Sequence, residues 1–369
     1  DGFSSEISFD VVEIEELIDW ILDKNIQPNT VCFPTISTDN KTLVYYDVSE
    51  NLIKTYYDGS LIESEDYFVG INPYVNNNSG INICLSDDGK TLLLLSARSI
   101  QVKKINSEKS GWINKGSNLS LFQEGFETNL FILSNQIMSL DGNTLIICRA
   151  IDPNGYYLPD PTSSYVAVYT YNEVSDIWTQ KGTKLLTTSR NEVASLSGDG
   201  NNIVVCYSSS EPANGQSYKS IWRRFICYYW NETSNEWLIK GNSILSNSRI
   251  YWWGYAHQHL AISENGTRVF ILYSIGGINC NMKLFDLIDD NWVEKTHIPF
   301  PNDSGDYWRQ PINMSPDGKL FSYYSTNNIL TIIDDNGNKL LDKRIQPDPI
   351  THTHPNSFNN MIYNNKFIY

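Results

Sequence analysis

The chain has 369 residues, of which 41% are hydrophobic and 19% are charged, and its formal net charge is −15. Closed β architectures of this length commonly form one domain, so we expect a single domain spanning 1–369. The acidic balance and the lack of a basic stripe argue against nucleic acid as a partner. No stretch approaches the roughly 20 apolar residues of a membrane span, so none is expected.

The N-terminal residues have two interpretations. Residues 7–12 alternate as a β-strand, and the segment from Trp20 to Lys24 contains a Trp followed by Lys, a pattern that recurs later in the chain. Alternatively, Asp10 could cap an amphipathic helix formed by the residues that follow it.

From residue 37 onward the phrase Ser-x-Asp-Gly-x-x-Leu recurs. Its copies begin at Ser37, Ser86, Ser139, Ser197, Ser263 and Ser315; the first is a weaker copy, with Asn40 in the Gly position. The copies are separated by about 49 to 66 residues, which indicates a repeat architecture. Because Asp-Gly lies between apolar stretches, each copy predicts a β-hairpin with a two-residue type I′ turn.

A second phrase, Trp-x-x-Lys, follows most hairpins, beginning at Trp112, Trp178, Trp237 and Trp292. Alternating stretches precede three of these tryptophans, at 166–171, 224–229 and 282–287. Each unit therefore has four short antiparallel strands, which is typical of a β-propeller blade.

The C-terminal residues 358–369 read as two strands around an Asn-Asn turn. We therefore predict a seven-bladed propeller in which 1–28 and 355–369 jointly form the closing blade. Such closure would remove the open sheet edges that favour aggregation. The alternative is six blades with an added N-terminal helix.

The six cysteines give a further indication. Cys148 and Cys206 each lie nine residues after the Ser of their repeat, where Leu95 and Leu272 stand in other repeats. We expect free, buried thiols and a reducing compartment, either cytoplasmic or virion-associated. No zinc-binding spacing is present, and neither a metal nor another cofactor is expected.

The hairpin phrase resembles the inner hairpin of WD40-like propellers, although the Trp-Asp and Gly-His dipeptides of true WD40 repeats are missing. Together with the Trp-x-x-Lys-Gly phrase, it looks closer to divergent FG-GAP-like repeats, found in bacteria and in large DNA viruses. The resemblance covers nearly the whole chain and implies a propeller fold. By resemblance alone, a viral structural or attachment component would be one instance of an interaction role. The segment Asp334–Asn338 is interpreted as a polar hairpin turn rather than as a calcium loop.

Candidate binding residues lie in predicted loops that share one face of the propeller. They are aromatic, with neighbouring His and Arg: Tyr251, Trp252, Trp253, Tyr255, His257, Tyr307, Trp308 and Arg309. Such residues suit protein hot spots and also sugar stacking. A further group comprises Tyr67, Phe68 and Tyr74. The alternative for any of these rings is packing between blades. Two His-x-His pairs, 257/259 and 352/354, have no further ligands at metal-binding spacing.

No catalytic motif is found, and the residue before each repeat Ser is Ile, Leu or Met rather than a carboxylate. We expect a non-enzymatic scaffold that docks a protein partner through the aromatic loops. The alternative is a glycan-binding, lectin-like propeller, and a hydrolase or lyase acting in the channel has less support.

Overall fold

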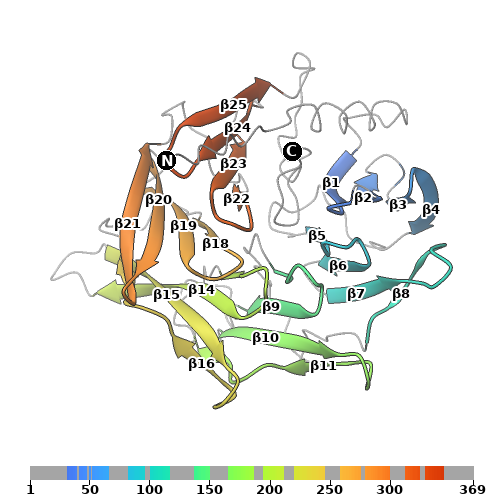
Figure 1. Cartoon of the computed structure of the whole chain (residues 1–369), viewed down its shortest axis with the longest axis horizontal. Helices are drawn as coiled ribbons and strands as arrows, with labels where there is room; N and C mark the ends of the chain where they lie inside the picture. Colours follow the sequence, from blue (N-terminus) through green and yellow to red (C-terminus); the bar gives the residue numbers. More distant parts are fainter. Residues whose placement is uncertain are drawn as a thin grey trace, which may run out of the picture.

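The structure is a computed structural model. It describes residues 31–39, 41–47, 50, 52–65, 82–95, 100–116, 137–149, 165–186, 194–211, 220–245, 258–275, 279–299, 312–324 and 329–344. These residues form six antiparallel sheets arranged around a central axis (Figure 1). The predicted β-propeller is therefore confirmed, and the described residues contain no helix.

We number the sheets as blades 1 to 6 in chain order. Their strands are β1 (Val31–Ile36), β2 (Thr42–Asp47), β3 (Leu52–Tyr57) and β4 (Ser60–Glu65) in blade 1; β5 (Asn82–Leu85), β6 (Thr91–Leu95), β7 (Ile100–Ile105) and β8 (Trp112–Asn114) in blade 2; β9 (Thr144–Arg149), β10 (Tyr165–Asn172), β11 (Ile177–Gln180) and β12 (Leu185–Leu186) in blade 3; β13 (Ala194–Leu196), β14 (Asn202–Glu211), β15 (Ser220–Asn231), β16 (Glu236–Ile239) and β17 (Ile244–Leu245) in blade 4; β18 (Gln258–Ile262), β19 (Arg268–Ile275), β20 (Asn279–Ile288) and β21 (Asn291–Pro299) in blade 5; and β22 (Ile312–Met314), β23 (Leu320–Tyr324), β24 (Ile329–Asp334) and β25 (Lys339–Arg344) in blade 6.

Blades 3 and 4 differ slightly from the regular pattern. The inner strand of blade 3 is reduced to a single bridge between Met138 and Leu145. The outer strand of each of these blades is in two pieces, β11 with β12 and β16 with β17, which pair with the same neighbouring strand. The break falls at Gly182 or Gly241, whose φ angles of 74° and 72° do not fit a strand.

The hairpin phrase forms a different turn from the one predicted. In blade 2, Gly89 has a φ of 67°, whereas Asp88 is not among the positive-φ residues, so the turn is not type I′. Instead, the Ser86 hydroxyl donates to Asp88 (2.7 Å) and accepts the backbone N–H of Thr91 (2.8 Å). Ser139, Ser197 and Ser315 make the same two bonds. A buried Ser that bonds both the turn carboxylate and the next strand therefore defines the hairpin.

The hydrophobic core lies between successive blades. Along the second strand of each blade, the residue after the hairpin phrase faces the following blade. Val204 of blade 4 packs with Leu260 and Val269 of blade 5, and Phe270 of blade 5 packs with Phe321 of blade 6. The described cysteines Cys84, Cys148, Cys206 and Cys227 are buried in this core, as predicted.

The described residues form six blades, one fewer than the seven predicted. The predicted closing blade was assigned to 1–28 and 355–369, which lie outside the described residues, as does the alternative helix after Asp10. The sheets that end and begin the described ring are blade 6 and blade 1, and no described strand lies between them (Figure 1).

Candidate functional site

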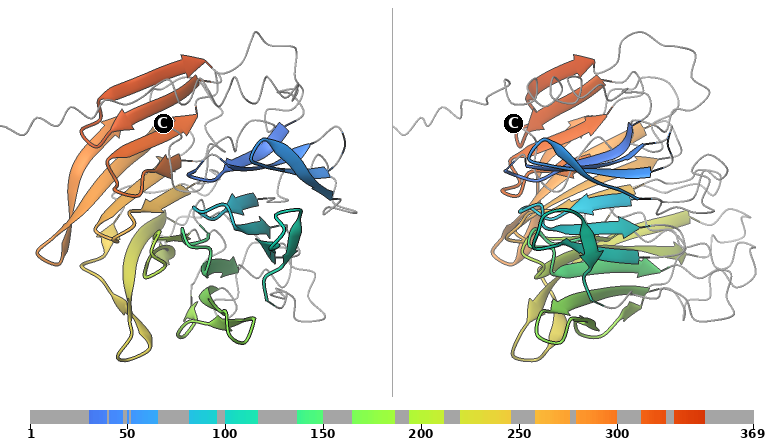
Figure 2. Two further views of the ribbon diagram at one scale, coloured as in Figure 1. Left: turned by 45° about the vertical axis from the view of Figure 1, so that its right-hand side comes forward. Right: turned by 90° about the vertical axis from the view of Figure 1, so that its right-hand side faces the viewer.

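The propeller has two unlike faces. On one, which we call the hairpin face, short turns join the first strand to the second and the third to the outer strand in every blade. The opposite face, the loop face, receives the other connections because successive strands are antiparallel. The right-hand view of Figure 2 shows the tight hairpin turns along one side of the ring. Long connections therefore leave the sheets on one face only.

All of the predicted binding residues fall in loop-face connections. Tyr251 to His257 belong to the connection between β17 and β18, and Tyr307 to Arg309 to that between β21 and β22. These residues lie outside the described part of the chain, as do Tyr67, Phe68, Tyr74 and the pair His352/His354. The structure does, however, place the strands on which both connections end. β18 and β22 are inner strands of neighbouring blades and pack against each other.

The repeated tryptophans join each blade to the preceding one. The indole Nε1 of Trp178 donates to the backbone carbonyl of Lys115, 2.8 Å away in blade 2. Trp237 and Trp292 make the same bond to the carbonyls of Lys181 (2.9 Å) and Lys240 (2.8 Å). These indoles are buried, so each bond satisfies a polar group that the junction between the blades would otherwise leave unpaired.

The repeated lysines reach in the opposite direction, into the following blade. Lys115 Nζ donates to the carbonyl of Gly142 (2.9 Å) and to Asn143 Oδ1 (2.7 Å), both in the hairpin turn of blade 3, and to Thr91 Oγ1 (2.9 Å). Lys181 makes equivalent bonds to the turn of blade 4. Burial lowers the pKa of Lys115 to about 8. The buried Lys115 ammonium, with its three acceptors, therefore holds the hairpin turn of blade 3 against β6 of blade 2.

The glycine of each hairpin turn is in close contact with the preceding blade. A Cβ added at Gly142 would lie 2.5 Å from the Cβ of Thr91, and one added at Gly200 would lie 2.8 Å from that of Thr144. Both glycines also have a φ near 70°. Five of the six phrases therefore have Gly at this position for two reasons: the backbone has a positive φ, and a side chain of the preceding blade leaves no room for a Cβ.

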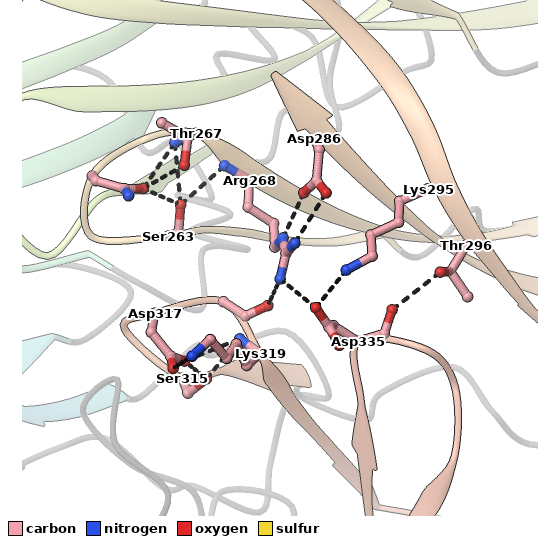
Figure 3. A network of polar contacts seen from close by, with 12 residues as sticks. Ser263, Thr267, Arg268, Asp286, Lys295, Thr296, Ser315, Asp317, Lys319 and Asp335 are labelled. Atoms are coloured by element: carbon pink, nitrogen blue, oxygen red, sulfur yellow. Dashed lines mark hydrogen bonds and ion pairs between the residues drawn. The ribbon is translucent and has the colours of Figure 1, made fainter. Parts of the chain in front are cut away.

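The junction between blades 5 and 6 uses a different set of side chains (Figure 3). Arg268 stands where blades 1 to 4 have Thr or Asn, and its Nη1 donates to the carbonyl of Gly318 (2.8 Å) and to Asp335 Oδ2 (2.9 Å). Its Nε and Nη2 bond the two oxygens of Asp286. The hydrogen bonds to Asp286 are the main reason that the pKa of Arg268 is raised. Lys295, of the Trp-x-x-Lys phrase, pairs with Asp335. Arginine therefore replaces the lysine contact to the turn carbonyl here.

Sequence reasoning used the tryptophans and lysines only as strand markers and missed these contacts between blades. The sequence contained a signal for these contacts, because polar and aromatic residues that recur in phase with a repeat are placed to contact the neighbouring repeat. The Asp334–Asn338 segment forms the polar turn that was predicted, in which Asp334 Oδ1 accepts the N–H groups of Asn336 and Asn338. Within the described ranges, no group of three or more His, Cys, Asp or Glu side chains is placed to hold a metal ion.

Comparisons with known proteins support the fold alone. No protein-family model and no curated protein matches the chain. Among solved structures, a functionally unknown protein from Desulfotomaculum acetoxidans is similar with a TM-score of 0.50 and 10% identity, covering 85% of this chain and 84% of that one. TolB from Acinetobacter baumannii is similar with a TM-score of 0.40 and 11% identity, over 84% and 62% of the two chains. The class is thus a β-propeller, and the WD40-like or FG-GAP-like resemblance and a viral origin have no support from sequence families. No described helix is long and apolar enough to cross a membrane.

Proposed function

We propose that this protein is a non-enzymatic scaffold that docks a protein partner through the loop face. The observation that carries the proposal is the asymmetry of the two faces. Hairpin-face turns are short and bonded internally, whereas connections of up to about 20 residues leave the loop face. Binding residues concentrate in long connections on rigid frameworks, because such connections vary while the framework holds them in place.

The contacts between blades supply that rigidity. Buried tryptophans, together with lysine and arginine side chains, tie blades 2 to 6 together on the hairpin-face side. A partner bound on the loop face would therefore meet a surface whose base does not rearrange, which lowers the entropic cost of binding. The scaffold in this proposal is a closed ring with a seventh blade.

Two aromatic segments are the proposed contact region. The segments containing Trp252 and Trp308 lead into β18 and β22, which are adjacent inner strands. Their attachment points are therefore neighbours on the ring, although they are separated by more than 50 residues in the sequence. Aromatic residues together with Arg309 give the composition typical of interface hot spots.

The test is affinity capture from the native source, comparing the wild type with a Trp252→Ala/Trp253→Ala/Trp308→Ala variant. A matched control changes exposed apolar residues of the hairpin face, Val174→Ala and Ile288→Ala, whose side chains are 99% and 52% exposed. We expect a partner that the triple variant loses and the control keeps. Equal capture by all three proteins would refute the docking face.

The same variants distinguish the alternative. If no protein is captured, a glycan array with the triple variant alongside decides whether the aromatic segments bind sugars instead. Identification of the partner also tests the proposed cytoplasmic or virion setting.

A further inference from the structure

We propose that the residues before β1 and after β25 together fill the space between blade 6 and blade 1, packing on two apolar sheet faces that the described residues leave without a neighbour. The argument starts from the other junctions. In each of them, the face directed at the following blade and the face directed back at the preceding blade contribute to one hydrophobic cluster.

The forward face of blade 6 does not belong to such a cluster. Its residues Leu320, Ser322 and Ile332 share one side of the sheet, because Ser322 pairs with Ile332 and lies two residues from Leu320. Among the described residues, Leu320 and Ile332 cluster only with Leu341 of the same blade. Nevertheless, Ser322 is only 1% exposed, so other residues must cover it.

The backward face of blade 1 gives the same result. Ile36, Leu43 and Tyr45 occupy the positions that face the preceding blade in the other repeats, and Tyr45 stacks on Tyr56 with ring centroids 6.1 Å apart. Leu43 is 3% exposed and Tyr45 is 2% exposed. Burial is the main reason that the pKa of Tyr45 is raised, and its hydrogen bond with Tyr56 adds to the effect. No cluster of described residues links this face to blade 6.

The two faces do not cover each other. Among described strands, inner strands of neighbouring blades pack together, as β1 with β5 and β18 with β22, but β22 and β1 have no comparable packing. A buried apolar face without a described neighbour requires a further element in the space between.

The backbone of blade 6 also departs from the repeat. In blades 1, 2, 3 and 5, the N–H of the residue after the repeat Ser donates to the same position of the next blade, as from Thr38 to Asp87 (2.9 Å) and from Asp87 to Leu140 (2.8 Å). In blade 6 this residue is Pro316, which accepts from Glu264 but has no N–H. An element that follows blade 6 must therefore dock without this backbone hydrogen bond.

The occupant follows from the chain itself. Thirty residues precede β1 and 25 follow β25, and both ends of the described ring lie beside the same space. The Ser322 hydroxyl, which has no hydrogen-bond partner among the described residues, also predicts that the occupant presents a polar group at this depth.

A photo-cross-linking experiment on the full chain tests the proposal. A diazirine amino acid is placed at position 322, and, as a matched control, at position 204, the equivalent forward-facing site of blade 4. The control is expected to cross-link within blade 5, between Leu260 and Phe285, since Val204 packs there. The probe at 322 is expected to cross-link within the same molecule to residues 1–30 or 345–369.

Three outcomes would overturn the proposal. Cross-links from 322 directly to blade 1 would show a sealed six-bladed ring. Cross-links to a second copy, detected as a covalent dimer, would show that another molecule fills the space. The absence of any cross-link at 322, when the control reacts, would show a face open to solvent. These outcomes test the seventh-blade part of the proposed function and do not depend on partner docking, so ring closure and docking through the loop face can fail separately.

Discussion

The contact between hairpin glycines and the preceding blade leads to the most specific prediction. Gly142→Ala would place a Cβ 2.5 Å from the Cβ of Thr91, a distance that real Cβ atoms do not show. Gly59→Ala is the matched control: Gly59 has a φ of 78°, close to the 67° of Gly142, but a Cβ there would meet nothing within 4 Å. The two variants therefore share the backbone penalty and differ in the contact.

The expected magnitudes follow from these two terms. Holding an L-residue in the left-handed region lowers the free energy of unfolding by about 1–2 kcal/mol in both variants. Overpacking a rigid contact lowers it by about 1–3 kcal/mol more in Gly142→Ala, and Gly59→Ala has no such contact. Gly318→Ala should fall between them, because its nearest neighbour is the Cδ of Arg268 at 2.8 Å, part of a side chain that can move. The predicted destabilisation is therefore smallest for Gly59→Ala, larger for Gly318→Ala and largest for Gly142→Ala.

Urea unfolding at 25 °C measures the free energies, with native-state hydrogen exchange of β6 and β9 as a local readout, since repeat arrays do not always unfold in one step. The control should leave exchange in β6 and β9 unchanged. If Gly142→Ala and Gly59→Ala lower the free energy of unfolding equally, the contact between blades does not determine the choice of glycine, and the reasoning fails.

Three further predictions concern the polar groups at the junctions. Lys115→Met leaves three acceptors unpaired and should lower the free energy of unfolding by roughly 1–3 kcal/mol, measured in urea at pH 7. Because the pKa of Lys115 is about 8 in the folded protein, below its value in the unfolded chain, the wild type should gain stability between about pH 8 and 10.5. The variant should not show this gain, and a parallel pH dependence of the two proteins would contradict the prediction. Arg268→Lys cannot bond Asp286 and the turn carbonyl of Gly318 at once, so hydrogen exchange should rise in blades 5 and 6 while blade 2 is unchanged, and equal rates throughout would contradict it. Burial would raise the pKa of Asp317, but hydrogen bonds from Ser315 and Lys319 outweigh burial and lower that pKa. The ionised Asp317 therefore stabilises the folded protein above the unfolded pKa near 4, and this contribution is lost as the pH falls below it. Asp317→Asn should accordingly make the free energy of unfolding less dependent on pH in the acid range.

The sequence was sufficient to predict the blades because their strands are short, apolar and bounded by repeated turns. The strands before the tryptophans were predicted at 166–171, 224–229 and 282–287 and occur within β10, β15 and β20. The turn type was predicted wrongly because Asp-Gly was weighed alone. The preceding serine, Ser86 in blade 2, bonds the Asp side chain and the next strand, and such local bonds compete with a two-residue turn.

The candidate site was less predictable for a physical reason. Residues such as Trp253 and Trp308 lie in long connections without periodic patterning, so no repeat position specifies where their side chains point. The contacts at the junctions could have been predicted from the repeat. Lys115, Lys181 and Lys240 recur in phase, and a lysine at a regular position close to a buried tryptophan indicates a fixed partner in the adjoining repeat.

The junctions also bear on how such a chain can change its number of repeats. Each junction is encoded half in one repeat and half in the next, and the central halves are near copies. If a whole repeat ending before Ser197 were lost, Lys115 would meet the carbonyl of Gly200 and the side chain of Asn201, the groups that Lys181 binds now. Gene duplication or deletion of such a central unit would therefore preserve the lysine hydrogen bonds to the hairpin turn at its borders. The first and last units, with Asn40 in place of glycine and Pro316 in place of a donor, are the ones that such exchange could not supply.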